Sequence, residues 1–232
     1  MIRAVLFDLD GTLVDTEPLH FEAFSEILGN AGAPIARDAY FTRFIGLNDH
    51  DCFAAVLREH GKPADEARIA GDIKRKSGLY LAMLAGRNVF FPGAADFVRR
   101  CHARFPLMLV TGTLRHEAET ILRSADLRAL FLDIIAAEDV ARGKPDPDGF
   151  NLALGRIGFL LRQRDPVLPN ECLVVEDTAA GIEAAHRAGM LVLAVMHTAS
   201  AAVLGAADFV RPSFDQTDLD EVLRAVAQMH ST

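Results

Sequence analysis

The chain has 232 residues, of which 50% are hydrophobic, and its formal net charge is -8. This length allows one large domain or two small ones, and the acidic balance without a basic block argues against nucleic-acid binding. Cys52, Cys101 and Cys172 form no Cys-x-x-Cys pair, so neither a thiolate metal site nor a disulfide is expected. No apolar run has transmembrane length, and Asp8 and Asp10 interrupt the short N-terminal run. We therefore expect no membrane association and a location in the reducing cytoplasm.

The first predicted element is a buried strand over residues 2–7, because the run is short, strongly apolar and followed by a glycine turn. Strand alternation places Asp8 and Asp10, which follow it, on the same side. Two carboxylates at the end of a buried strand are costly unless a cation lies between them. The pair therefore indicates a hard metal ion and a carboxylate nucleophile, with a solvated turn or helix cap as the alternative.

Residues 16–87 are predicted to form a helical insert without strands. The first helix has an apolar face at helical spacing, with Pro18 in its first turn and Gly32 at its end. Further helices are expected over residues 38–44, 48–60 and 63–84, with Asn48 as the N-cap of the second of these.

From Val89 onward, strands and helices alternate. Strands are expected over residues 107–110, 132–136, 171–175, 191–195 and 207–210. Helices are expected from the turn at 91–93 to about residue 104, and over 114–124, 148–157, 179–188 and 219–229. This order predicts an α/β fold with a doubly wound, mostly parallel sheet. The expected domains are residues 1–15 with 88–232, and the helical insert 16–87.

Four polar positions lie at or just after the predicted strand ends: Asp8, Thr111, Lys144 and Asp177. Ligands bind beyond the carboxyl ends of the strands in sheets of this kind. We therefore expect the four side chains to meet in one site. Thr111 has a simple N-cap as its alternative role, because the next predicted helix begins close by.

The motifs at these positions resemble those of the haloacid dehalogenase superfamily, in its phosphotransferase branch. They are Asp8-Leu9-Asp10-Gly11-Thr12, Thr111-Gly112-Thr113, Lys144 within Gly143–Pro147, and Glu176-Asp177-Thr178 with Gly181. By pattern the chain is most similar to β-phosphoglucomutase-like and phosphoglycolate-phosphatase-like hydrolases. The resemblance implies a Rossmann-like core with a small mobile helical cap. It also implies a Mg2+-dependent phosphatase acting on a small phosphorylated metabolite, such as a sugar phosphate or a phosphoglycolate-like compound.

The resemblance also implies the catalytic roles of these residues. Asp8 is the expected nucleophile that becomes an aspartyl-phosphate, and Asp10 the acid and base. Asp8, Asp177 and the carbonyl of Asp10 are the expected Mg2+ ligands, and Glu176 holds a metal-bound water or orients Asp177. Charge supports this assignment, because the attacking carboxylate repels the negatively charged phosphate of the substrate. Two like charges about 4 Å apart cost about 4 kcal/mol at an effective dielectric of 20, and cations must offset this repulsion. Lys144 supplies a compact positive charge beside that of the metal.

Substrate contacts are expected from the motif loops and the insert. The candidates are Gly11, Thr12, Thr16, Glu17, His20, Asn48, Lys76, Gly112, Thr113 and Arg115. His20 has a helix-surface role as its alternative, and Lys76 lies in a charge run of the kind that is usually solvated.

Asp49 stands where the mutases that the chain resembles carry a cap arginine that grips a second phosphate. An acidic residue there is expected to repel that phosphate and to favour hydrolysis, unless Arg43 or Arg115 compensates. A phosphosugar mutase is the alternative function, and a non-catalytic phospho-ligand-binding regulator is a third. A monomer or weak homodimer is expected.

Overall fold

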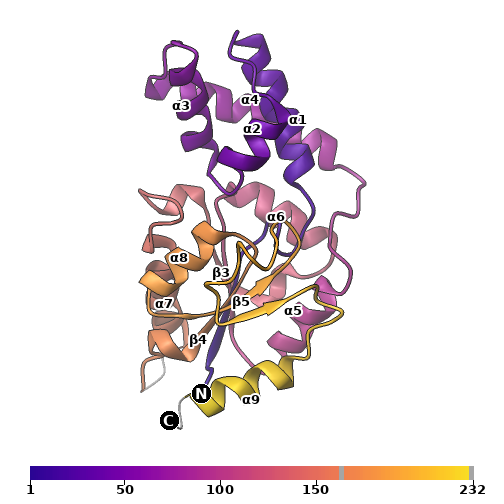
Figure 1. Cartoon of the computed structure of the whole chain (residues 1–232), viewed down its shortest axis with the longest axis vertical. Helices are drawn as coiled ribbons and strands as arrows, with labels where there is room; N and C mark the ends of the chain where they lie inside the picture. The colour runs from indigo at the N-terminus through magenta and orange to yellow at the C-terminus, as the bar shows by residue number, and fades with distance from the viewer. Residues whose placement is uncertain (162–164, 230–232) are drawn as a thin grey trace. The chain divides into compact units, whose positions relative to one another are not determined.

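The computed structural model describes residues 1–161 and 165–229, and the chain divides into two compact units. Unit 1 combines Met1–Val14 with Phe90–Thr232, and unit 2 is Asp15–Val89 (Figure 1). Unit 2 is therefore inserted directly after the first strand of unit 1. An isolated bridge between Val14 and Phe90 joins the two segments of unit 1 where the chain leaves and returns.

Unit 1 contains a six-stranded sheet in which every strand pair is parallel. The strands are β1 (Ala4–Phe7), β2 (Leu107–Val110), β3 (Phe131–Ile135), β4 (Cys172–Glu176), β5 (Leu191–Val195) and β6 (Phe209–Arg211). Their spatial order is β3-β2-β1-β4-β5-β6, so the chain builds outward from β1 in both directions. The predicted doubly wound α/β fold is confirmed. The strand order reverses beside β1, which is the point where such sheets bind ligands.

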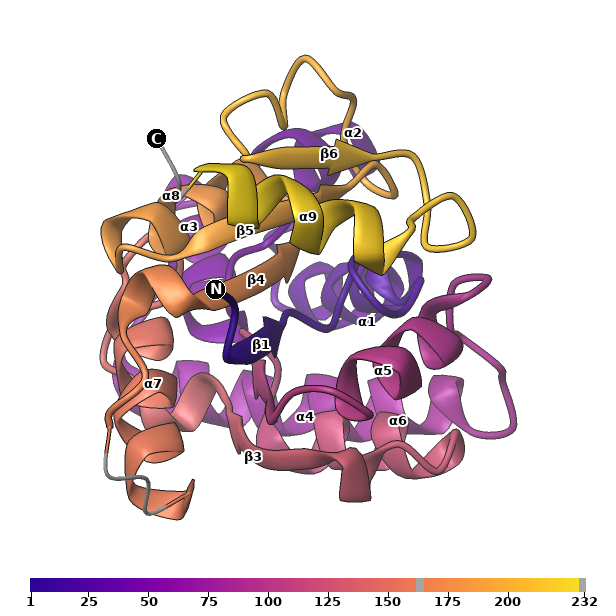
Figure 2. The same ribbon diagram turned by 90° about the horizontal axis from the view of Figure 1, so that it is seen from below.

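Helices cover both faces of this sheet. They are α5 (Ala94–His102), α6 (Arg115–Ser124), α7 (Asp148–Leu161), α8 (Ala179–Arg187) and α9 (Leu219–Met229). Short 3-10 turns are η2 (Arg128–Leu130), η3 (Ala137–Asp139) and η4 (Pro169–Glu171). Figure 2 shows α7 and α8 on one side of the sheet and α5 and α6 on the other. Crossovers of one hand produce this division, because the chain moves in opposite directions from β1 in its two halves.

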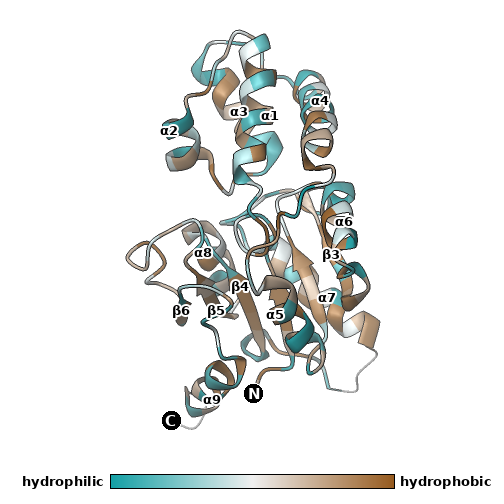
Figure 3. Ribbon diagram, turned by 90° about the vertical axis from the view of Figure 1, so that its right-hand side faces the viewer, coloured by the Kyte–Doolittle hydropathy of each residue, from teal (hydrophilic) through white to brown (hydrophobic). Residues whose placement is uncertain are grey.

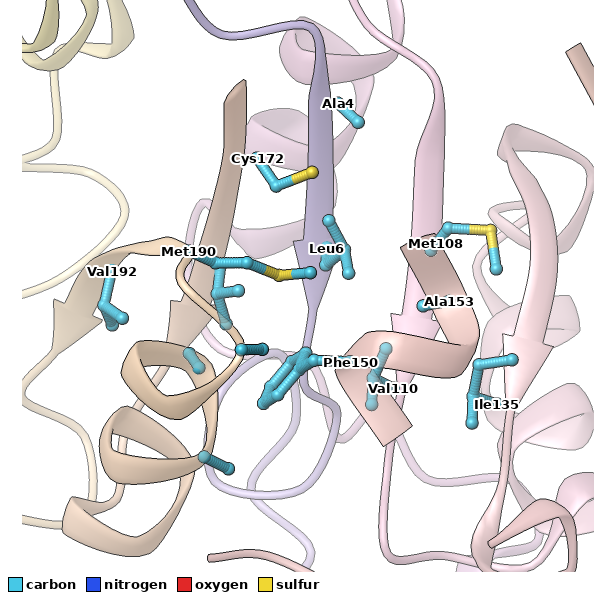
Figure 4. Packing of buried hydrophobic residues seen from close by; sticks show 14 of the residues in the cluster. Ala4, Leu6, Met108, Val110, Ile135, Phe150, Ala153, Cys172, Met190 and Val192 are labelled. Carbon is cyan, nitrogen blue, oxygen red and sulfur yellow. The ribbon is translucent and has the colours of Figure 1, made fainter. Parts of the chain in front are cut away.

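The central strand β1 is packed from both sides, and all four of its residues are buried. On one face, Figure 4 shows Phe150 of α7 and Met190 extending over the strand that carries Leu6. On the other face, the ring of Phe7 meets the edges of Phe97 and Phe131 at centroid distances of 6.2 and 6.0 Å. Strands covered on both faces form continuous apolar runs rather than alternating ones. This packing holds the end of β1, and thus Asp8, in a defined position.

Unit 2 is helical and has its own apolar core. Its helices are α1 (Glu17–Asn30), α2 (Arg37–Ala39), the π-helical turn η1 (Tyr40–Phe44), α3 (Asp49–Glu59) and α4 (Glu66–Leu84). Phe24 and Phe53 pack in this core with ring centroids 4.9 Å apart. Figure 3 shows α1 and α4 as mixtures of hydrophobic and hydrophilic residues, whereas the strand β4 in unit 1 is mostly hydrophobic. No strand occurs between residues 15 and 89, as predicted.

Two predicted boundaries in unit 2 are shifted. Helix α4 begins at Glu66 instead of residue 63, because the Asp65 side chain caps it by accepting a 3.0 Å bond from the Arg68 backbone N–H. The helix predicted over 38–44 is a short α2 followed by η1. In η1 the backbone N–H of Ile45 donates to Tyr40 O, five residues back, which widens the turn. Throughout the described ranges, no helix combines the length and apolarity that a membrane span requires.

Candidate active site

Asp8, Lys144 and Glu176 meet at the carboxyl ends of β1 and β4. Phe7, the last residue of β1, pairs with Val175 of β4, and the Asp8 backbone N–H donates to Val175 O over 3.0 Å. Lys144 Nζ lies 2.5 Å from Asp8 Oδ1 and 2.7 Å from Glu176 Oε1. One ammonium group therefore bridges carboxylates that follow or end neighbouring strands. A cis peptide bond joins Lys144 to Pro145.

Burial dominates the electrostatics of this triad. It raises the pKa of Asp8 to about 8, with the positive charge of Lys144 opposing the shift and the negative charge of Glu176 adding to it. Burial would also lower the pKa of Lys144, but Asp8 and Glu176 outweigh it and hold that pKa above its ordinary value. The two carboxylates therefore favour the charged form of Lys144, whereas burial favours the protonated form of Asp8.

Asp177, which is only 1% exposed, is held by two threonine hydroxyls. Thr12 Oγ1 donates to Asp177 Oδ1 over 2.6 Å, and Thr198 Oγ1 donates to Asp177 Oδ2. Burial raises the pKa of Asp177 well above its ordinary value, with further increases from the charges of Glu176 and Asp8. Thr12 was expected to contact substrate, whereas its hydroxyl is directed at this carboxylate. Thr198 carries no motif that marks it in the sequence.

Asp10 is engaged by the loop that follows β2. Thr113 Oγ1 donates to Asp10 Oδ2, and the Thr113 backbone N–H donates to Thr111 Oγ1 over 3.1 Å. Gly112 lies between these two threonines, in the same loop. Helix α6 has Leu114 as its N-cap residue, so the N-cap alternative for Thr111 is wrong. Thr113, a predicted substrate contact, instead orients the carboxylate expected to act as acid and base.

Both oxygens of the Glu176 carboxylate have hydrogen-bond partners. Its Oε2 accepts bonds from the backbone N–H groups of Asp177 and Thr178, at 2.8 and 2.9 Å, while Oε1 faces Lys144. It packs so closely on Gly181 that a side chain there would collide with it. Glu176 is thereby placed to orient Asp177 and Lys144.

Arg43 and Arg115, which were considered as residues that could compensate for Asp49, each pair with another acidic side chain. Arg115 pairs with Asp139 at 2.5 Å and donates to Ile134 O at 2.8 Å, beside β3. Arg43 pairs with Glu59 on the surface of unit 2. The geometry therefore gives no support to Arg115 as a substrate contact, because its guanidinium group is already engaged.

Lys76 lies inside unit 2, with its side chain 0% exposed. Its Nζ is 2.8 Å from Asp49 Oδ1 and 2.7 Å from His20 Nδ1, and the His20 ring stacks on Tyr80 at 4.2 Å. The solvated-face interpretation of Lys76 is wrong, and so is the surface interpretation of His20. The Lys76 ammonium group also neutralises the Asp49 carboxylate, so Asp49 is not the isolated negative charge that was expected to repel a second phosphate.

The remaining unit 2 candidates surround the starts of α1 and α3. Glu17, in the first turn of α1, accepts a 2.7 Å hydrogen bond from the Tyr40 hydroxyl. Thr16 is buried at the N-cap position of α1, where its side chain makes no capping bond. Asn48 Oδ1 accepts from the Asp51 backbone N–H over 2.9 Å, so Asn48 caps α3 as predicted.

Three histidines outside the motifs have defined partners. His50 and His186 pair with acidic side chains at the surface, while His197 stacks on Phe91 with ring centroids 3.9 Å apart. His197 Nδ1 also lies 3.0 Å from Thr12 O, next to the site. His230 lies outside the described residues.

The carboxylate oxygens of the site suit a divalent cation that is bound by only a few protein groups. Across residues 1–161 and 165–229, no group of three or more His, Cys, Asp or Glu side chains is arranged so that it could hold a metal ion. Lys144 pairs with Asp8 and Glu176, and the charges of both carboxylates act on Asp177. When all four groups are ionised, the three carboxylates and the one ammonium group have a net charge of -2. Mg2+ usually binds through one or two carboxylates, with water and substrate phosphate completing its shell. The excess charge and the oxygen-only donors match that pattern.

Comparison with known proteins finds relatives over almost the whole chain. The model of the family "haloacid dehalogenase-like hydrolase" matches residues 2–189. The chain is 30% identical to a phosphorylated carbohydrates phosphatase of Thermotoga maritima, covering 96% of this chain and 100% of the relative. It is 33% identical to a fructose-1-phosphate phosphatase of Escherichia coli, covering 80% and 92%. A β-phosphoglucomutase from Clostridium difficile has the same fold, with a TM-score of 0.87, 22% identity and full coverage of both chains.

Proposed function

Because the chain belongs to the haloacid dehalogenase-like hydrolase family, we propose that it is a Mg2+-dependent phosphatase of small phosphorylated metabolites, with sugar phosphates as its substrate class. The observation that carries this proposal is the Lys144 ammonium group bridging Asp8 and Glu176 at the strand ends. The relatives named for phosphorylated carbohydrates and fructose 1-phosphate support the substrate class.

In the proposed first step, a carboxylate oxygen of Asp8 attacks phosphorus, and the bond from phosphorus to the ester oxygen breaks. Asp10 gives its proton to the departing oxygen, so the product leaves as an alcohol. The bond from Thr113 Oγ1 holds the Asp10 carboxyl in place for this transfer. The result is an aspartyl-phosphate on Asp8.

In the second step, Asp10 takes a proton from a water molecule as that water attacks the aspartyl-phosphate. The bond between phosphorus and Asp8 breaks, which releases inorganic phosphate and restores the carboxylate. Lys144 stabilises the negative charge beside Asp8 in both steps. Asp8, Asp177 and the carbonyl of Asp10 would hold Mg2+, which supplies positive charge against the phosphoryl oxygens.

Phosphate release from a panel of monoesters tests the proposal directly. Purified full-length protein is incubated with hexose, pentose and short-acid phosphates, in Mg2+ and in excess chelator, with Asp8→Asn as the matched inactive control. Metal-dependent release of phosphate, absent in the variant, is the expected result. Isomerisation of a phosphosugar without net phosphate release would instead assign the chain to the mutases.

The role of unit 2 and the cellular location are also part of this proposal. Unit 2 is assigned as the substrate-selecting cap, and unit 1 as the catalytic core, on the basis of its insertion directly after the nucleophile loop. A cytoplasmic location is supported by three buried free thiols. We assign a monomer or weak homodimer as the working state.

A further inference from the structure

Asp177 is held by a residue that belongs to none of the four sequence motifs. Thr198 lies in the loop after β5, and its Oγ1 is within hydrogen-bond distance of Asp177 Oδ2 and, at 3.1 Å, of Asp177 O. One hydroxyl group thereby contacts both the side chain and the main chain of the same residue. Its position restrains the Asp177 carboxylate relative to the backbone.

The other oxygen of this carboxylate is restrained from a different part of the chain. Thr12 Oγ1, in the loop after β1, donates to Asp177 Oδ1 over 2.6 Å. Each carboxylate oxygen therefore has its own hydroxyl donor, and the two donors come from loops at different strand ends. Rotation of the carboxylate breaks at least one of these bonds, so the pair fixes its plane.

Gly11 makes room for this arrangement. Its φ is +78°, a left-handed conformation that glycine adopts without steric cost. A Cβ atom at this position would collide with the Asp177 carboxylate and lie 2.7 Å from Thr198 Cγ2. The loop after β1 therefore accommodates both residues at close range. The contact between Thr198 and Asp177 is part of a packed structure and not an isolated surface hydrogen bond.

We propose that Thr198 is a positioning residue that orients Asp177 to hold the divalent cation. This inference rests on the proposed function, because it takes the Asp177 carboxylate as a cation ligand. A hydroxyl donor uses one lone pair of an oxygen and leaves the other lone pair for a metal. Partners hydrogen-bonded to ligating groups typically change metal affinity by about 10- to 100-fold when they are removed.

The test measures Mg2+ binding by isothermal titration calorimetry on the full-length protein, without substrate. Thr198→Val keeps the shape and removes the hydroxyl, and we expect it to raise the Kd for Mg2+ by about tenfold or more. Thr198→Ser keeps the hydroxyl and is expected to retain an affinity close to that of the wild type.

Thr217→Val is the matched control, because Thr217 is also buried but donates to Ser213 O, outside the site. Its Kd for Mg2+ is expected to equal that of the wild type. Should Thr198→Val fail to fold, Thr198→Ala gives the same comparison.

Wild-type affinity in the folded Thr198→Val or Thr198→Ala variant overturns the inference and leaves the proposed function standing. An equal loss in Thr217→Val also overturns it, because the effect would then be a general one. A wild-type protein that takes up no Mg2+ overturns the proposed function, and this inference with it.

Discussion

Asp8 combines three features that suit a nucleophile at a metal site: burial, a lysine at 2.5 Å and a neighbouring glutamate. Burial favours its protonated form, whereas a cation favours its ionised form. Additional positive charge next to the residue therefore favours its ionised form. The same holds for Asp177, whose pKa burial also raises.

Replacement of the nucleophile is the first prediction at this scale. Asp8→Asn keeps the size of the side chain but removes the attacking oxygen charge, so we expect phosphate release to fall by at least about 1000-fold. Circular dichroism and the melting temperature check that the fold is retained. A folded variant with near wild-type turnover would refute the assignment of Asp8.

Proton-linked metal binding is the second prediction. The pKa of Asp8 is raised to about 8, so below that pH a proton must leave before the carboxylate can hold a cation. Mg2+ affinity should therefore rise as the pH increases from 6 to 8, by up to about tenfold per pH unit for one displaced proton. Above pH 8 the contribution of Asp8 to this dependence should level off.

Calorimetry at pH 7 in two buffers with different ionisation enthalpies measures this linkage. Released protons make the observed binding enthalpies differ between the buffers. Identical enthalpies would show that no proton leaves on binding, contrary to the raised pKa.

At the scale of elements, the helix starts can be predicted from local sequence signals, whereas the pairing of Lys76 depends on long-range contacts. Asn48 and Asp65 cap α3 and α4 through bonds to the backbone three residues on, and such caps are visible in a sequence. The partner of Lys76 is not visible in the same way, because Asp49 lies 27 residues away on another helix. Its charge run predicts a solvated surface, and only the packing of α1, α3 and α4 shows the buried cluster.

Asn48 gives a prediction that separates a structural from a substrate-binding role. Asn48→Ala should lower the free energy of unfolding by about 1 kcal/mol through loss of the cap, while Asn48→Asp retains it. Denaturant unfolding measures the first effect. KM should stay near the wild-type value in both variants, and a large rise in KM with unchanged stability would restore Asn48 as a substrate contact.

At the scale of the whole molecule, a cation that bridges the loops after β1 and β4 should stabilise unit 1. A ligand at 100 times its Kd contributes about 2.7 kcal/mol to folding stability. We therefore expect Mg2+ to raise the melting temperature of the wild type, and Asp177→Asn to abolish most of this increase. Differential scanning calorimetry with and without Mg2+ provides the measurement, and an equal increase in both proteins would argue against Asp177 as a ligand.

The sequence by itself determined the order of strands and helices, because apolar periodicity and glycine, proline and capping residues act over a few positions. It also identified the site candidates Asp8, Asp10, Lys144 and Asp177, because a doubly wound sheet places the carboxyl ends of its strands at one edge. Tertiary structure alone decided which groups satisfy these charges. Thr198 holds Asp177, Thr113 holds Asp10, and Asp49 neutralises Lys76. Such pairings depend on distances between loops and helices remote in sequence, and no local pattern encodes those distances.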